Sequence, residues 1–431
     1  MSSYKTMPTP GNTEWFVKDR FGMFIHFGLY SMPARHEWVQ NYEPIPEEHY
    51  HKYFELFNPD LLDAREWARA AKNAGMKYAI LTTKHHEGFC LFDSKYTEYK
   101  VTNTPYGKDI VKEYVEAFRA EGLKVGLYYS LLDWNHPSYP LDVAHCYAHY
   151  ENAEEMDKGR DMKVYAQYIR NQVEELLTNY GKIDIIWFDY SFKYDTCPQK
   201  LKPWMQFEGG KGKEQWESEK LIELCRRCQP GIMINNRTGI LQDVYTPEQK
   251  RATEWVKNEN GDLLVWEVCH TFSGSWGYHR DEMTWKSDKM LIDLLTSTVA
   301  YGGNVIMNVG PCSRGYIDHR AMNALNAYGE WMKYNSRSIY GCTMAEPEFK
   351  APEGTVLTQS NDEKRLYVHL QNYPFGRLFV DNIADKIHYA QFLSDGSEIK
   401  YEQIKDSNTI MFNLPTIPPK GISPVVEIFL K

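Results

Sequence analysis

Polar and ionisable side chains recur where the apolar runs of this sequence end. A histidine, tyrosine, carboxylate or arginine closes or follows one run after another along the first 270 residues. The residues concerned are His26, His85, His86, Tyr128, Tyr129, Asp189, Asn235, Asn236, Arg237, Glu267 and His270. A single residue of this kind can serve as a helix cap or a loop hydrogen bond. A succession of them indicates a pocket rich in hydrogen-bond donors and acceptors, as a polyhydroxylated ligand requires.

Asp189 carries the strongest chemical signal. It closes the apolar run IDIIWF between aromatic residues. It can cap the next helix, pair with Arg237, or act as the nucleophile at a glycosyl or acyl centre. Glycoside hydrolysis needs a second carboxyl group, about 5–5.5 Å away for retention of configuration and about 6.5–9.5 Å away for inversion. Spacing alone does not choose among the candidate glutamates, which are Glu37, Glu87, Glu248, Glu254 and Glu267.

A metal site is an alternative use of the same side chains. His26, His85, His86 and Asp189 could hold an ion in a barrel hydrolase or isomerase. Adjacent histidines point to opposite faces of a regular strand, so His85 and His86 reach one ion only if the strand has already ended. No HExxH motif or paired CxxC motif is present, and the CxxC at 225–228 lies in a helix-like stretch without a partner pair. We therefore predict no metal and no cofactor.

The elements that must position these residues alternate in type up to about residue 335. Strands are expected at 21–29, 77–85, 124–134, 183–190, 231–237, 263–270 and 304–310. Helices are expected at 65–75, 109–122, 161–179, 214–228, 288–300 and 318–334. No glycine-rich dinucleotide turn follows the first strand, so a (β/α)8-like barrel fits better than an open doubly wound sheet. Strand C-termini meet at one face of such a barrel, which would gather the polar residues there.

The sequence changes character after about residue 345. Runs such as RLYVHLQN, TIMFNL and VVEIFLK alternate with turn signals, and no long helical pattern accompanies them. This pattern predicts a small antiparallel β domain, a sandwich. We therefore expect a catalytic barrel at 1–340 and a β-sandwich domain at 341–431.

Composition narrows the classes of partner and compartment. The 58 acidic side chains outnumber the 49 basic ones, giving a net charge of −9, which speaks against a general nucleic-acid or anionic-membrane binder. No apolar run approaches the length of a membrane-spanning helix, and the N-terminus has no apolar core for a signal peptide. Eight cysteines without an export signal predict reduced thiols and a cytoplasmic protein. The 14% aromatic content suits sugar stacking, but it also suits a large core.

Six blocks make the sequence similar to a known family. They are FGMFIHFGLYSMPARHEW, YAILTTKHHEGFCLFDS, GLYYSLLDW, IIWFDY, WEVCHTFSGSWGYHRDE and YGGNVIMNVGP. In this order they resemble the motif series of the α-L-fucosidases of glycoside hydrolase family 29, from about residue 12 to 340. The resemblance implies retaining hydrolysis of terminal α-linked L-fucose, on an irregular barrel followed by a β-sandwich. It implies a small-molecule partner, a fucosylated glycan, and is compatible with a homo-oligomer.

The resemblance also implies roles for individual residues. Asp189 matches the family nucleophile. Histidines, Trp38 and Arg237 can hydrogen-bond ring hydroxyls, while aromatic faces can cover the C5 methyl that distinguishes fucose from galactose. The expected substrate-binding residues are His26, Glu37, Trp38, His85, His86, Tyr129, Trp187, Arg237, Glu267 and Trp276. Two positions depart from the common family pattern: Phe27 often is Trp, and Tyr190 often is Gly, so a bulkier neighbour of the nucleophile could narrow the aglycone side.

Two glutamates compete for the role of general acid/base. Glu267, in WEVCH, lies at an expected strand end, so topology favours it. Glu248 lies in the loop after Arg237, where Pro247 stiffens the backbone, and YTPE resembles a Thr-x-Glu pattern that supplies the acid in several family members. Because a loop carboxylate at the rim can face the departing sugar, we assign Glu248. A metal-dependent barrel hydrolase and a catalytically inactive fucose-binding protein are the competing hypotheses, and the presence of Asp189 argues against the latter.

Overall fold

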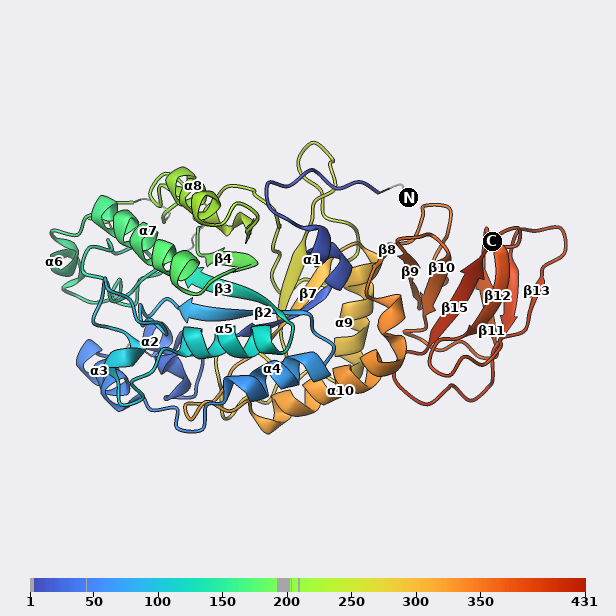
Figure 1. The fold of residues 1–431 in the computed structure, drawn as a ribbon, viewed down its shortest axis with the longest axis horizontal. Coiled ribbons are helices and arrows are strands. Elements are labelled where there is room, and N and C mark those ends of the chain that lie inside the picture. Colours follow the sequence, from blue (N-terminus) through green and yellow to red (C-terminus); the bar gives the residue numbers. More distant parts are fainter. Residues whose placement is uncertain (1–3, 44, 192–201, 203, 208–209) are drawn as a thin grey trace.

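A curled sheet of parallel strands organises the larger part of the chain in this computed structural model. The structure describes residues 4–43, 45–191, 202, 204–207 and 210–431. Within these residues the sheet has seven strands in the order β5-β4-β3-β2-β1-β7-β6, and all neighbours are parallel. The strands are β1 (Phe21–Ile25), β2 (Tyr78–Lys84), β3 (Lys124–Ser130), β4 (Ile185–Asp189), β5 (Met233–Ile234), β6 (Glu267–Thr271) and β7 (Asn304–Val309) (Figure 1).

An irregular segment, residues 244–248, fills the gap between β5 and β6. Parallel bridges pair Val244 with Asn235, Tyr245 with Trp266, and Glu248 with Cys269. The segment therefore takes the place of an eighth strand. This arrangement confirms the expected (β/α)8-like barrel, although β5 has two residues where a strand was expected over 231–237.

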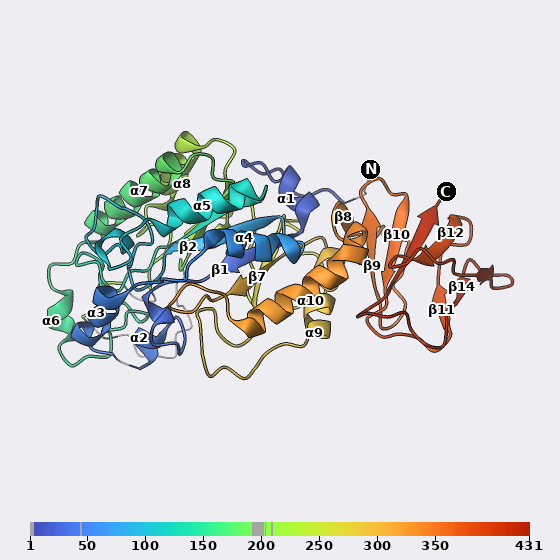
Figure 2. The ribbon, with the colours of Figure 1, turned by 60° about the horizontal axis from the view of Figure 1, so that its bottom comes forward.

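Helices follow the strands and cover the outside of the sheet (Figures 1 and 2). The longer ones are α4 (Ala64–Asn73), α5 (Ile110–Ala120), α7 (Met162–Asn179), α8 (Ser218–Cys228), α9 (Asp288–Ala300) and α10 (His319–Asn335). The shorter ones are α1 (Glu14–Asp19), α2 (Val39–Tyr42), α3 (Glu47–Leu56), α6 (Ala153–Asp157), η1 (Leu29–Ser31), η2 (Val101–Asn103), η3 (Asn236–Thr238) and η4 (Ser336–Ser338). Side-chain caps start several of them: Asp109 accepts a hydrogen bond from the Lys112 amide, and Ser287 from the Met290 amide.

Strand alternation sorts the side chains between the inside of the barrel and the helices. Phe24, Tyr128, Trp187 and Cys269 belong to one buried cluster inside the barrel. Tyr129, the next residue along β3, belongs to the larger cluster between the strands and the helices. Successive residues of a strand point to opposite faces, so only one residue of such a pair can reach the site.

The C-terminal part, described without a gap, forms two antiparallel sheets. One has the order β12-β15-β10-β9-β8 and the other β11-β14-β13, and their facing sides share one apolar core. The strands are β8 (Cys342–Met344), β9 (Val356–Ser360), β10 (Arg365–His369), β11 (Arg377–Val380), β12 (Ile387–Phe392), β13 (Tyr401–Gln403), β14 (Ile410–Asn413) and β15 (Val425–Leu430). This domain lies at one end of the long axis (Figure 1). Its Ser423 hydroxyl donates a hydrogen bond to Asp293 of α9 (2.6 Å).

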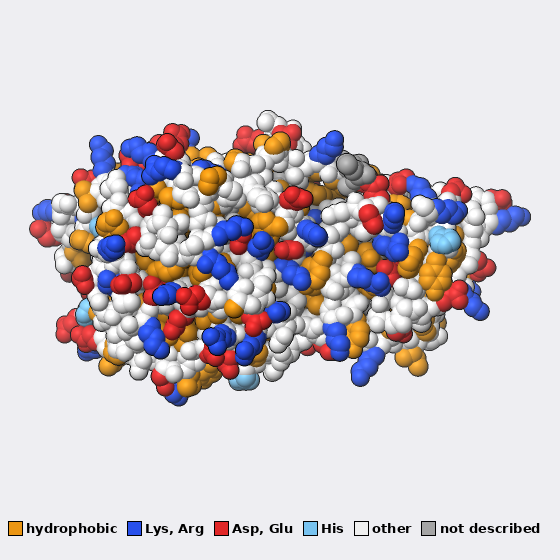
Figure 3. Space-filling model, viewed as in Figure 1, with side chains coloured by type: hydrophobic (Ala, Val, Ile, Leu, Met, Phe, Trp, Pro, Cys, Tyr) orange, Lys and Arg blue, Asp and Glu red, His pale blue; other side chains and the backbone are white. Residues whose placement is uncertain are grey.

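Among the described residues, no helix combines the length and apolarity needed to cross a bilayer. The face shown in Figure 3 has basic and acidic side chains interspersed across both domains. The seven cysteines in the described part of the chain are free thiols.

Candidate active site

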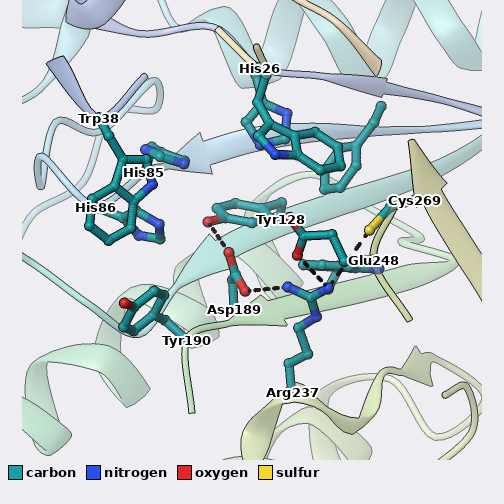
Figure 4. Close-up of a pocket in the computed structure, with 13 residues that line it drawn as sticks. His26, Trp38, His85, His86, Tyr128, Asp189, Tyr190, Arg237, Glu248 and Cys269 are labelled. Atoms are coloured by element: carbon teal, nitrogen blue, oxygen red, sulfur yellow. Dashed lines mark hydrogen bonds and ion pairs between the residues drawn. The ribbon is translucent and has the colours of Figure 1, made fainter. Parts of the chain in front are cut away.

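A cavity opens at the C-terminal face of the barrel, where the strands end. Aromatic rings, histidines, two carboxylates and one guanidinium line it (Figure 4). The lining residues are Phe24, His26, Trp38, His85, His86, Tyr128, Trp187, Asp189, Tyr190, Arg237, Glu248, Cys269 and Trp276. Most of the residues predicted from sequence therefore meet here, from segments up to 250 positions apart.

One side of the cavity, which we call the carboxylate wall, consists of Asp189, Arg237 and Glu248. Arg237 Nη1 lies 2.9 Å from Asp189 Oδ1, and Arg237 Nη2 lies 2.9 Å from Glu248 Oε2. The Tyr128 hydroxyl donates to the other Asp189 oxygen (2.9 Å). A single guanidinium thus holds both carboxylates at one edge of the cavity, as Figure 4 shows.

The two carboxylates differ in exposure and in what surrounds them. The Asp189 side chain is 14% exposed and the Glu248 side chain 43%. Burial acts to raise the pKa of Asp189, but the charge of Arg237 and the hydrogen bonds from Arg237 and Tyr128 outweigh it and hold that pKa below its usual range. Asp189 is therefore an ionised, nearly buried carboxylate, whereas Glu248 is open to solvent at the rim.

Two neighbouring residues, Trp187 and Thr246, hold Arg237 in place. Its guanidinium lies over the Trp187 ring, 4.6 Å from the centroid. Its Nε donates to Thr246 Oγ1 (3.2 Å), on the irregular segment 244–248. The segment that replaces the eighth strand therefore fixes Arg237 and carries Glu248 as well.

The opposite side, the histidine wall, consists of His26, His85 and His86. His26 follows β1, and His85 and His86 follow β2, which ends at Lys84. Because the strand has ended, both adjacent rings reach the cavity. Burial lowers the pKa of His26 to about 3 and that of His86 to about 4, and it holds the pKa of His85 well below its usual range. The histidine wall is therefore uncharged at neutral pH.

Aromatic rings connect the two walls. Trp38 packs edge-on against His86 (5.1 Å between centroids), and Tyr190 packs against the same two rings. On the other side Trp276 lies 5.2 Å from His26, and Tyr128 stacks on Trp187 (5.6 Å, 22°). These faces provide apolar surface beside the polar groups, as a deoxy-sugar with one methyl group requires.

Tyr129, expected to bind the substrate, does not line the cavity. Its hydroxyl donates to Gln172 of α7 (2.8 Å), and its ring contacts the Lys84 ammonium on the helix side of the sheet. Tyr128 lines the cavity instead and bonds Asp189. The motif YYS contains two tyrosines, and the register of β3 places Tyr128, rather than Tyr129, in the cavity.

Glu267 is also displaced from its expected position. The strand expected over 263–270 begins only at Glu267, so this residue starts β6 rather than ending it. Its side chain, 1% exposed, accepts a hydrogen bond from Tyr78 inside the barrel and is not among the residues that line the cavity. Burial raises the pKa of Glu267 to about 8. Burial therefore favours the protonated form of this side chain.

Other predicted polar residues support the site from behind. Glu37 is buried and accepts hydrogen bonds from the backbone amides of Trp276 (3.1 Å) and Gly277 (2.9 Å), so it holds the loop that carries Trp276. Asn235 bonds both backbone groups of Phe188 and pins the end of β4. His270 bonds Gln249 and the Lys250 carbonyl outside the cavity.

Four residues that line the cavity were not among the expected catalytic and substrate-binding residues. They are Phe24, Tyr128, Tyr190 and Cys269. Phe24 and Cys269 lie two residues from His26 and Glu267, so period-two alternation was the signal that could have found them. Tyr190 directly follows Asp189 and has φ of 79°, a left-handed conformation that is strained for an aromatic residue.

The alternative hypothesis of a metal site concerns His26, His85, His86 and Asp189. No group of three or more His, Cys, Asp or Glu side chains in the described ranges is arranged to hold an ion. The His26 ring uses Nδ1 for a hydrogen bond with Asn308, and the His86 ring uses Nδ1 for one with Ser130.

Comparisons with known proteins give the family. The sequence model of the family described as alpha-L-fucosidase matches residues 3–337. An alpha-L-fucosidase of Dictyostelium discoideum is 27% identical over 98% of this chain and 92% of that protein. The structure of alpha-L-fucosidase isoenzyme 1 from Paenibacillus thiaminolyticus is 40% identical with a TM-score of 0.88, covering 97% of this chain and 98% of that chain. A Bacteroides thetaiotaomicron GH29 alpha-L-fucosidase, solved as a trapped covalent intermediate with 2-fluoro-fucosyl fluoride, is 27% identical with a TM-score of 0.82, covering 100% and 99%.

The family match and the structural similarity extend over the barrel whose cavity is described above. The chain is a glycoside hydrolase and belongs to the α-L-fucosidases of glycoside hydrolase family 29.

Proposed function

We propose that this protein is a retaining exo-α-L-fucosidase that releases terminal α-linked L-fucose from oligosaccharides or glycoconjugates. Asp189 is the nucleophile and Glu248 the acid/base. The observation that carries the proposal is the shared guanidinium, through which Arg237 pairs with Asp189 by one nitrogen and with Glu248 by the other. The buried carboxylate is held ionised, as a nucleophile requires, and the exposed one can exchange protons with water, as an acid/base requires.

The chemistry takes two displacement steps. In the first, Asp189 attacks the anomeric carbon while Glu248 gives a proton to the glycosidic oxygen, so the bond to the leaving group breaks as the glycosyl ester forms. In the second, Glu248 takes a proton from the water that attacks the anomeric carbon, and fucose leaves with its original configuration. The Arg237 charge that stabilises the free Asp189 carboxylate also favours its departure in the second step.

The remaining cavity residues hold the sugar. The uncharged histidine wall and Arg237 offer hydrogen bonds to ring hydroxyls, while Trp38, Trp187 and Trp276 offer apolar faces. Phe24 and Trp187, both buried, line the cavity from inside the barrel. A glycan therefore enters from the C-terminal face of the barrel, with its terminal sugar foremost. This geometry supports action on terminal residues.

The test of the acid/base assignment compares Glu248→Ala with Glu267→Ala on a dinitrophenyl fucoside plus azide. Removal of the true acid slows hydrolysis of natural-type substrates by about 10²–10⁴-fold. It slows hydrolysis far less when the leaving group of the substrate departs without protonation. Azide then attacks the glycosyl-enzyme and gives fucosyl azide of retained α configuration. We expect this product from Glu248→Ala.

Glu254, an exposed glutamate six positions further along, supplies the matched control, and Glu254→Ala should behave as the unmodified enzyme. If α-fucosyl azide forms only with Glu267→Ala, the two roles exchange. If the unmodified enzyme releases fucose of inverted configuration, as seen by NMR during the first minutes of hydrolysis, the retaining mechanism is wrong.

A further inference from the structure

Two rings of the histidine wall use one nitrogen inside the protein and present the other to the cavity. His26 Nδ1 lies 2.6 Å from Asn308 Oδ1, and His86 Nδ1 lies 2.7 Å from Ser130 Oγ. Nε2 of either ring bonds to none of the described residues, and both rings line the cavity (Figure 4). The direction of each Nδ1 hydrogen bond therefore decides what Nε2 offers to a ligand.

Asn308 determines the direction at His26. Its Nδ2 donates to the Trp276 carbonyl oxygen (2.6 Å), which can only accept. This contact fixes the orientation of the amide, so its oxygen faces His26 and also can only accept. His26 Nδ1 therefore carries a proton.

Ser130 determines the direction at His86 by a different route. Its hydroxyl has one proton, which it donates to the Leu132 carbonyl oxygen (2.6 Å). Towards His86 the hydroxyl oxygen is left as an acceptor. His86 Nδ1 therefore carries a proton as well.

Each ring holds a single proton at neutral pH. His26 is 5% exposed and His86 2%, and burial lowers the pKa of both far below neutrality. Because that one proton is on Nδ1, Nε2 of both rings is a lone-pair acceptor. Asn308 (3% exposed) and Ser130 (0%) are themselves buried, so water does not compete for these hydrogen bonds.

We propose that Asn308 and Ser130 are positioning residues that fix His26 and His86 as Nδ1–H tautomers. In this state Nε2 of each ring accepts a hydrogen bond from a sugar hydroxyl. The identity of the ligand rests on the proposed function, but the tautomers do not. Arg237, across the cavity, has donors only. A hydroxyl that contacts Nε2 of His26 or His86 must give its proton, and a substituent that can only accept, such as fluorine, finds no hydrogen-bond donor on these two rings.

The tautomers are tested directly by NMR on the unmodified enzyme. With ¹⁵N-labelled histidine, long-range ¹H–¹⁵N correlation distinguishes protonated from unprotonated ring nitrogens, and His26→Gln and His86→Gln variants assign the two signals. We expect Nδ1 to be protonated in both rings. A protonated Nε2 in either free ring would overturn the inference for that ring, whether or not the enzyme cleaves fucosides.

Variants of the two positioning residues test the consequence for ligand binding. Ser130→Ala removes the acceptor, so His86 should become a mixture of tautomers, and Ser130→Thr, which keeps a hydroxyl, should restore the single tautomer. We compare L-fucose with the monodeoxyfluoro-L-fucose in which fluorine replaces the hydroxyl that donates to His86 Nε2. By calorimetry, L-fucose should bind the unmodified enzyme about tenfold more tightly. In Ser130→Ala this ratio should shrink towards one.

These outcomes separate the two proposals. An unchanged fluorine penalty in Ser130→Ala, with His86 still protonated at Nδ1, would show that Ser130 does not set the tautomer. Tight and equal binding of all monodeoxyfluoro-L-fucoses to the unmodified enzyme would contradict the acceptor role of the wall. Absence of any L-fucose binding, with the tautomers as expected, would instead contradict the proposed function.

Discussion

His26 and His86 of the histidine wall and Asp189 of the carboxylate wall are all largely buried, yet burial has opposite outcomes for their charge. On the histidine wall burial outweighs the nearby Asp189 charge, so the pKa values of His26 and His86 fall and the rings stay neutral. On the carboxylate wall burial acts on Asp189 in the same way, but Arg237 lies 2.9 Å away and the carboxylate stays charged. A bonded counter-ion decides whether a buried group keeps its charge.

The difference assigns the two walls different tasks. Neutral hydrogen-bonding groups can hold a neutral sugar without paying for a buried charge. An ionised carboxylate with a fixed guanidinium can attack an anomeric carbon and stabilise the charge that moves during reaction. Substitutions on each wall test this division of tasks.

Removing the buried carboxylate abolishes the reactive side of the cavity. Asp189→Ala should lower turnover of every fucoside, activated or not, by about 10³-fold or more, because no group is left to form the glycosyl ester. The protein should still fold, since Glu248 remains to pair with Arg237. Turnover of an aryl fucoside and thermal unfolding report the two effects. A variant that retains a tenth of normal turnover would end the assignment of Asp189.

Removing the counter-ion should make the carboxylate wall behave like the histidine wall. In Arg237→Gln burial acts on Asp189 without its main opposing charge, so the pKa of Asp189 rises. Asp189 must be ionised to attack, so activity is present above its pKa and is lost as pH falls through it. The acidic limb of the profile of kcat/KM should therefore move to higher pH, and kcat/KM at the optimum should fall about 10²-fold.

Arg280→Gln is the control for that experiment, because Arg280 is 70% exposed and lies outside the cavity. Its pH profile should match that of the unmodified enzyme. An acidic limb that stays in place, or moves to lower pH, in Arg237→Gln would contradict the account of Asp189.

The two adjacent tyrosines of β3 offer a matched pair. Tyr128→Phe removes a hydrogen bond to ionised Asp189, so kcat/KM should fall about tenfold to a hundredfold. Tyr129→Phe removes a hydrogen bond to buried Gln172 on the helix side, so the free energy of unfolding should fall by about 1 kcal/mol while kcat/KM stays unchanged. Kinetics and urea unfolding of both variants give the answer. The reverse pattern would show that Tyr129, as first expected, faces the sugar.

Tyr190 stands where the two walls meet, next to Asp189 and against the His86 ring. Tyr190→Gly and Tyr190→Ala both remove the ring, but only glycine adopts a φ of 79° without strain. The glycine variant should therefore be more stable than the alanine variant by about 1 kcal/mol in chemical unfolding. Equal stability of the two would mean that the backbone at Tyr190 is not held in the left-handed conformation.

Local patterns predicted much of this arrangement. Continuous apolar runs located β1 to β4 and β7, and the side chains that follow them, such as His26, His85 and Asp189, reach the cavity because parallel strands all end at one face. The antiparallel sheets after residue 341 followed from alternating runs and turn signals. These signals depend on neighbours in sequence, so one sequence is sufficient to see them.

Register and long-range pairing were the features that local pattern could not supply. Whether Tyr128 or Tyr129 points inward depends on how β3 pairs with β2, and the β2–β3 register shifts between Thr82 and Lys84. The run before Glu267 is apolar, although strand β6 begins only at that residue. The segment 244–248 has no strand pattern, and its bridges to Asn235, Trp266 and Cys269 exist only in the folded barrel.

A covalent bond between Asp189 and the sugar can be detected by labelling the enzyme with a slow substrate. The enzyme is incubated with 2-deoxy-2-fluoro-α-L-fucosyl fluoride, whose fluorine at C2 slows both displacement steps while the fluoride leaves without needing an acid. Intact mass should rise by one fluorofucosyl group, and the peptide that contains IIWFDY should carry the label on Asp189. Label on a peptide without Asp189, or inactivation without any rise in mass, would contradict the account.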